Sequence, residues 1–127
     1  MFELMVEMTF SAAHRLRTGN KKCERLHGHN WKVQLFLSGN KLNKDGVLLD
    51  FKEIKEKLEK IVIPLDHTYL NEFPSFKKIN PTSENIAYYL YQKLKVLFSK
   101  NKGTKISKVT VWEGEKTSAS YFPGKNR

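Results

Sequence analysis

The sequence predicts an α+β domain built from a four-stranded antiparallel sheet with two helices on one face. Three observations lead to this prediction. Two segments with apolar residues at alternate positions come first, two segments with helical apolar spacing follow, and two further strand-like segments end the chain. At 127 residues the chain can form one hydrophobic core, so we expect a single domain over residues 1–127.

The first two predicted strands each have one apolar face. The first strand carries apolar side chains at even positions, namely Phe2, Leu4, Val6, Met8 and Phe10, and His14 continues this series. The second strand carries them at odd positions, namely Trp31, Val33, Leu35 and Leu37, and His27 and His29 extend this series toward the preceding turn. Three of the chain's four histidines therefore point inward at one end of the predicted sheet.

The two predicted helices occupy the middle of the chain. The first helix is predicted for residues 51–61, where the apolar residues are spaced by three and four. Asp50 is its expected N-cap, and Pro64 is expected to end it. Residues 65–71 and 72–80 are expected to be loops. A second helix begins at the Pro81-Thr82-Ser83-Glu84 segment and runs to about Ser99.

Two strands at residues 106–113 and 118–122 complete the predicted sheet, and residues 122–127 are expected to form a mobile tail. The six predicted elements follow one another in the order strand, strand, helix, helix, strand, strand. An open four-stranded sheet leaves two exposed edges, which favours association of subunits into a closed ring.

The formal net charge of +10 indicates attraction to anionic partners, although solvated surface lysines account for most of it. A subset of the basic residues surrounds the three inward histidines and suits a substrate with a triphosphate: Arg15, Arg17, Lys21, Lys22, Arg25 and Lys32. A nucleic-acid-binding module is the competing class. We expect no nucleic-acid partner, because the Phe and Tyr residues mostly occupy core positions and do not alternate with the lysines.

The single cysteine cannot form an internal disulfide, which fits a reducing compartment. The first residues include Glu3 and Glu7 and lack a continuous apolar run. We therefore expect neither a signal peptide nor a membrane partner, and a cytoplasmic location.

Three inward imidazoles at one end of an apolar face suit Zn(II), one ion per subunit, with one coordination position open for chemistry. The expected ligands are His14, His27 and His29. Two alternatives remain at this point: satisfied core histidines without metal, or a structural zinc site in which Cys23 is the fourth ligand.

Five motifs occur in an order that resembles the 6-pyruvoyltetrahydropterin synthase and 6-carboxytetrahydropterin synthase family. They are Phe-Ser-Ala-Ala-His at 10–14, Cys-x-x-x-His-Gly-His-Asn at 23–30, Leu-Asp-His at 65–67 with Leu-Asn at 70–71, Pro-Thr-x-Glu-Asn at 81–85, and Val-x-Val-Trp-Glu at 109–113. The short spacing between the cysteine and the His-Gly-His is similar to the bacterial 6-carboxytetrahydropterin synthases of queuosine biosynthesis. The Glu-Gly-Glu-Lys at 113–116 departs from the family, which more often has threonine after the first glutamate.

The resemblance implies the tunnelling fold, in which subunits form a barrel, here a homohexamer built as a dimer of trimers with active sites at subunit boundaries. It also implies that Cys23 is the catalytic base, which cationic neighbours would favour as thiolate. Asp66 and His67 would be its acid/base partner and would reach the cysteine of a neighbouring subunit. From the sequence alone, this pair could equally serve the turn that follows Pro64.

Glu113 follows Val109 and Val111 at every second position of the predicted strand, so its side chain points to the same inward face. A carboxylate therefore lies at the end of a row of apolar side chains. Such a group needs a partner. The amino and ring N–H groups of a pterin offer two parallel donors, so we expect Glu113 to bind the substrate. A salt bridge with a lysine is the alternative, and Glu115 is a possible substitute if the strand is bulged.

The reaction implied by the resemblance is the zinc-dependent conversion of 7,8-dihydroneopterin triphosphate to 6-carboxy-5,6,7,8-tetrahydropterin, with release of acetaldehyde and triphosphate. Such an enzyme is a lyase. Within the same family, a 6-pyruvoyltetrahydropterin synthase would eliminate triphosphate from the same substrate, and the sequence does not separate the two products.

Overall fold

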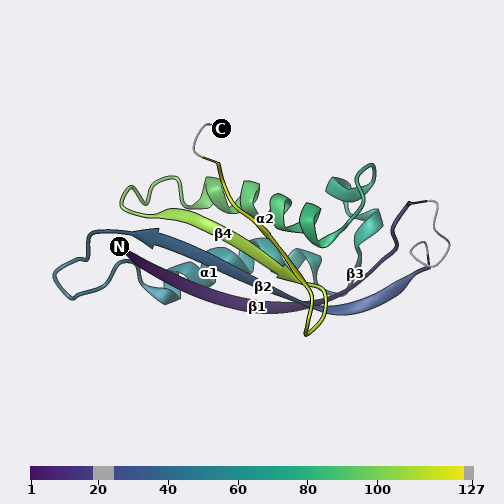
Figure 1. The fold of residues 1–127 in the computed structure, drawn as a ribbon, viewed down its shortest axis with the longest axis horizontal. Coiled ribbons are helices and arrows are strands. Elements are labelled where there is room, and N and C mark those ends of the chain that lie inside the picture. Colours follow the sequence, from purple (N-terminus) through teal and green to yellow (C-terminus); the bar gives the residue numbers. More distant parts are fainter. Residues whose placement is uncertain (19–24, 125–127) are drawn as a thin grey trace.

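The computed structural model describes residues 1–18 and 25–124 (Figure 1). Its long elements follow the predicted order and are listed here with their bounds: β1 (Phe2–His14), β2 (His27–Gly39), α1 (Phe51–Val62), α2 (Ser83–Leu97), β4 (Lys105–Trp112) and β5 (Ser118–Tyr121). Short elements connect α1 to α2: η1 (Ile63–Leu65), β3 (Thr68–Tyr69), η2 (Leu70–Glu72) and η3 (Pro74–Phe76). The α+β prediction is confirmed.

The sheet has five strands in the order β3-β1-β2-β4-β5. The four predicted strands pair antiparallel with one another, β1 with β2, β2 with β4 and β4 with β5. The fifth strand, β3, was not expected, because residues 65–71 were predicted to be a loop. It pairs in parallel with β1, with Thr68 opposite Ala12 and Tyr69 opposite Ala13. A two-residue strand is too short to show an alternating pattern, so periodicity could not reveal it.

Both helices begin at the predicted caps. The Asp50 side chain accepts a hydrogen bond from the Lys52 backbone N–H at the start of α1. The Thr82 hydroxyl accepts one from the Asn85 backbone N–H at the start of α2. Each cap satisfies a donor that has no partner within its helix, which defines where the helix starts.

One hydrophobic core joins the helices to the inward face of the sheet. It contains the inward residues of β2 and β4 together with the apolar faces of α1 and α2, and its fully buried members include Leu35, Leu37, Leu58, Leu90 and Val109. Figure 1 shows α1 and α2 on the same side of the sheet, as the parity of the strands predicts. In the described ranges, no helix has the length and apolar character needed to cross a membrane.

Candidate metal centre and active site

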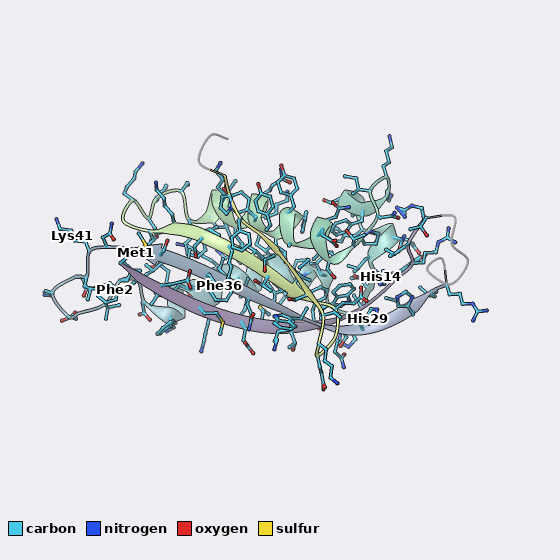
Figure 2. All side chains as sticks on the ribbon, viewed as in Figure 1. Met1, Phe2, His14, His29, Phe36 and Lys41 are labelled. Atoms are coloured by element: carbon cyan, nitrogen blue, oxygen red, sulfur yellow. The ribbon has the colours of Figure 1, made fainter. Side chains whose placement is uncertain are left out.

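The pairing of β1 with β2 brings the three predicted ligands together. His14 is the last residue of β1 and lies opposite His27, while His29 lies opposite Ala12 two positions along. One ring nitrogen from each of the three histidines can be chosen so that all three atoms lie within 4.8 Å of one another. Figure 2 shows His14 and His29 near one end of the molecule, far from Met1 and Lys41 at the other end. The structure therefore brings together the three histidines that the sequence places on one face, and their role as zinc ligands stays a prediction.

Backbone carbonyls orient two of the rings. The Nδ1 atom of His14 lies 2.8 Å from the Pro81 carbonyl oxygen, and the Nδ1 atom of His27 lies 2.7 Å from the Arg25 carbonyl oxygen. A carbonyl can only accept, so each Nδ1 carries the proton and each neutral ring has its lone pair on Nε2. The two Nε2 atoms are 3.0 Å apart. Two facing lone pairs at this distance need a proton or a cation between them.

The third ring has a buried nitrogen without a partner. Within residues 1–18 and 25–124, the Nε2 atom of His29 is buried and has no hydrogen-bond partner. Burial lowers the pKa of both His14 and His29 below the usual 6.5, mainly because a charged ring loses its hydration. Both rings are therefore neutral near pH 7, which is the form that binds metal ions.

These donors fit zinc. Ligands about 2.0–2.1 Å from a tetrahedral zinc ion lie about 3.3–3.4 Å from one another, and the His14–His27 separation of Nε2 atoms is close to this value. Backbone acceptors behind the rings are the usual arrangement around a metal-binding histidine. Trp31 is fully buried, and its ring packs in a T-shaped arrangement against the rings of both His14 and His29.

Glu113 approaches this cluster from the end of β4. Its Oε1 atom lies 3.6 Å from His29 Nε2, and its Oε2 atom lies 3.9 Å from His14 Nε2. The side chain is 37% exposed, so the carboxylate is only partly removed from water. No lysine or arginine among residues 1–18 and 25–124 forms a salt bridge with it, so the alternative of a strand-end lysine partner is wrong for the part of the chain described.

Asp66 and His67 form a second polar group at the edge of the sheet. The Asp66 carboxylate accepts a hydrogen bond from the Ser11 backbone N–H at 2.8 Å and lies 2.9 Å from Nδ1 of His67. The His67 backbone N–H donates to the Ser11 carbonyl at 2.6 Å, and its φ of 58° is in the left-handed region. The Ser11 N–H, followed by smaller contributions that include His67, lowers the pKa of Asp66 below 3.8. The side chains of Asp66 and His67 therefore contact each other, which their adjacency in the sequence did not establish.

The pair does not contact the three histidines within the described part of the chain. The His67 side chain is 82% exposed and faces a hollow of about 440 Å³ that is also lined by Ser11, Asn30 and His29. Ser11 and Asn30 are joined there by a hydrogen bond of 2.7 Å between their side chains. The structure therefore holds Asp66 and His67 together at the sheet edge, with the His67 ring largely exposed.

Cys23, Lys21 and Lys22 lie outside the described residues, so their predicted roles remain predictions. Of the other predicted phosphate ligands, Arg17 is already engaged. Its guanidinium donates to the carbonyl oxygens of Phe76, Lys77 and Ile79. Lys32 lies over the Trp112 ring, 5.1 Å from its centre. Arg15 and Arg25 are exposed, and their role in binding the triphosphate stays a prediction.

Several supporting groups were not predicted from the sequence. The amides of Asn71 and Asn80 extend β1 beyond His14, because each exchanges hydrogen bonds with the backbone of Arg15 or Arg17. The Pro81 carbonyl orients His14 from 67 residues away. Asn71 and Pro81 lie in the motifs on which the family resemblance depends, but no local pattern indicates what they contact.

Comparison with known proteins agrees with the geometry. The family model described as 6-pyruvoyl tetrahydropterin synthase matches residues 3–124. The chain belongs to this family. Family membership confirms the resemblance drawn from the five motifs.

Relatives within the family carry different names. The chain is 36% identical to a 6-carboxy-5,6,7,8-tetrahydropterin synthase from Synechocystis, with 74% of this chain and 75% of the relative covered. It is 29% identical to a dihydroneopterin monophosphate aldolase from Pyrococcus furiosus, with 87% and 89% covered. The structure of a 6-pyruvoyl tetrahydropterin synthase from Caenorhabditis elegans superposes with a TM-score of 0.85 at 28% identity, covering 97% of this chain and 96% of that one.

Proposed function

We propose that the protein is a zinc-dependent 6-carboxy-5,6,7,8-tetrahydropterin synthase of queuosine biosynthesis. It converts 7,8-dihydroneopterin triphosphate to 6-carboxytetrahydropterin and releases acetaldehyde and triphosphate. The observation that carries the proposal is the convergence of one ring nitrogen from each of three histidines in a chain of this family. Relatives named for this activity support the choice of product.

The histidines would hold one zinc ion per subunit, which lowers the pKa of hydroxyl groups bound to it. In this proposal Cys23 is the base that removes the proton from the carbon of the substrate side chain. Glu113 accepts hydrogen bonds from the pterin N–H groups in this proposal. Its carboxylate is available for them because it forms no salt bridge with a lysine or arginine in the described structure. Arg15 and Arg25 attract the triphosphate.

Asp66 and His67 complete the proton transfer in this proposal. The contact between Asp66 Oδ2 and His67 Nδ1 fixes the ring so that Nε2 is the atom that exchanges a proton. Because the ring is exposed and does not contact the histidine cluster of its own chain, we propose that it serves the Cys23 of a neighbouring subunit in a homohexamer. The sheet edges at β3 and β5 offer the strands for such an assembly.

A mixing experiment tests the shared site. Cys23→Ala and His67→Ala proteins are each expected to be inactive alone. If one site takes its cysteine and its histidine from different subunits, mixing the two after mild dissociation restores up to about a quarter of the parental sites, by random pairing. Sedimentation of the parent gives the subunit number. Two inactive variants that stay inactive in a verified mixed oligomer would contradict the sharing.

Product analysis tests the reaction. Incubating the zinc-loaded protein with dihydroneopterin triphosphate should give acetaldehyde and the carboxypterin. The pyruvoyl product would instead assign the other synthase activity of the family. Absence of turnover, together with a salt-sensitive affinity for RNA that zinc removal leaves unchanged, would favour the nucleic-acid-binding alternative.

The aldolase from Pyrococcus furiosus supplies a second candidate activity, because it matches most of this chain. Comparing the triphosphate with the monophosphate of dihydroneopterin separates the two. The synthase proposal expects turnover of the triphosphate, whereas cleavage of only the monophosphate would assign the aldolase activity.

A further inference from the structure

The carboxylate of Glu113 lies beside two of the three histidine rings. One oxygen is 3.6 Å from the Nε2 atom of His29, and the other is 3.9 Å from the Nε2 atom of His14. Donor atoms around a tetrahedral zinc ion are separated by about 3.3–3.4 Å. Both distances are therefore within about half an ångström of the spacing expected between two ligands of one ion.

The local structure directs Glu113 toward the cluster. Trp112 pairs with Lys32 of β2, so the next residue along β4 lies beside the strand end that carries His29. The Glu113 backbone N–H donates to the Thr117 carbonyl, which closes the turn before β5. The indole of Trp112 is in turn held by a hydrogen bond to Gln34. Hydrogen bonds therefore fix the end of β4 next to Glu113, and its side chain points to the same face of the sheet as that of Val111.

The chemistry around the carboxylate requires a cation. The Nδ1 proton of His14 is committed to the Pro81 carbonyl, so the neutral ring presents a lone pair toward Glu113. Among the described residues the buried Nε2 of His29 has no hydrogen-bond partner, and it lies 3.6 Å from this carboxylate. A negative oxygen that faces the His14 lone pair is repelled unless a positive charge lies between them, and no lysine or arginine in the described ranges supplies that charge.

We propose that Glu113 is the fourth zinc ligand in the substrate-free protein and that it leaves the metal when substrate binds. The exchange would replace a carboxylate oxygen by hydroxyl oxygens of the substrate side chain, with no redox change. The released carboxylate would then be available to accept hydrogen bonds from the substrate. This inference rests on the zinc site of the proposed function and gives Glu113 two successive partners.

Metal binding by the purified, metal-free protein tests the first half of this inference. Glu113→Gln keeps the size of the side chain but removes its charge, and Glu115→Gln is the matched control because Glu115 is exposed and lies two residues away. Competition with a chelator should show zinc affinity lowered roughly 10- to 100-fold in Glu113→Gln, a loss at least as large as that of an outer partner. Glu115→Gln should match the parent.

Cobalt(II) substitution supplies the second readout. The visible spectrum of the cobalt protein should differ between the parent and Glu113→Gln, and dihydroneopterin should change the parent's spectrum as the carboxylate leaves. Equal zinc affinity and identical cobalt spectra in the two proteins would overturn the assignment of Glu113 while leaving the three-histidine site intact. A parent that binds no zinc, or a His14→Ala variant that binds it equally well, would overturn both proposals.

Discussion

The three histidines are placed by strand pairing, whereas Asp66 and His67 are placed by a tight turn at the sheet edge. Every histidine of the cluster occupies a position in the continuous register of β1 with β2. The Asp66 and His67 pair instead depends on one left-handed residue and on two hydrogen bonds with Ser11. The first region is rigid because many pairs must break together before it moves. The second region can be altered by changing one carboxylate.

The largest expected effect is the loss of zinc when one histidine of the cluster is replaced. His14→Ala, His27→Ala and His29→Ala should each lose bound zinc, because each removes one of three converging donors. His67→Ala should keep it, since its ring lies outside the cluster. Metal content measured after gel filtration checks all four variants. Equal metal loss in the four would show that the ligand assignment is wrong.

The next effect concerns Cys23 and separates catalysis from structure. As the base, its replacement by alanine should slow proton abstraction by roughly 100-fold or more. Zinc content and the thermal midpoint should stay near those of the parent. If Cys23 instead completes a closed zinc site, the same variant should lose metal and stability together, because structural zinc contributes to folding. Measuring zinc, unfolding and substrate binding on this one protein decides between the two roles.

An effect of the same order on turnover is expected for the edge region. Asp66→Asn keeps an oxygen that can accept from the Ser11 N–H, but it removes the charge next to His67. We expect turnover to fall by roughly 10²-fold or more, the scale of general acid–base catalysis, with zinc content unchanged. Asp66→Ala should add a loss of thermal stability, because the Ser11 N–H loses its partner. Equal turnover in the parent and Asp66→Asn would remove the pair from the mechanism.

The smallest effect is a dependence of stability on pH. The lowered pKa of Asp66 means that the folded chain binds this proton more weakly than the unfolded chain does. Its stabilising contribution is therefore present above pH 3.8 and is lost as the pH falls through the lowered pKa. Thermal midpoints of the parent and Asp66→Asn should differ above pH 3.8 and converge below it. A constant difference across this range would exclude an electrostatic contribution from Asp66.

These two regions also differ in how far the sequence predicts them. Alternation along β1 and β2 places His14, His27 and His29 on one face, and the antiparallel pairing of two strands that follow each other in the chain brings them together. The caps at Asp50 and Thr82 are equally local. The turn at His67 is not, because its conformation depends on Ser11, 56 positions earlier in the chain. The approach of Glu113 to the cluster likewise depends on the register of β4 with β2, which alternation does not reveal.

The pairing of β1 with β2 has a consequence for how this chain can change length. The strands run residue for residue from Phe2 opposite Gly39 to His14 opposite His27. Deletion of one residue near the middle of either strand would turn its histidines to the opposite face. A deletion or insertion between Arg15 and Leu26 leaves the ligand pairing as it is. Over evolutionary time, length variation compatible with zinc binding should collect in that connection and be excluded from the strands.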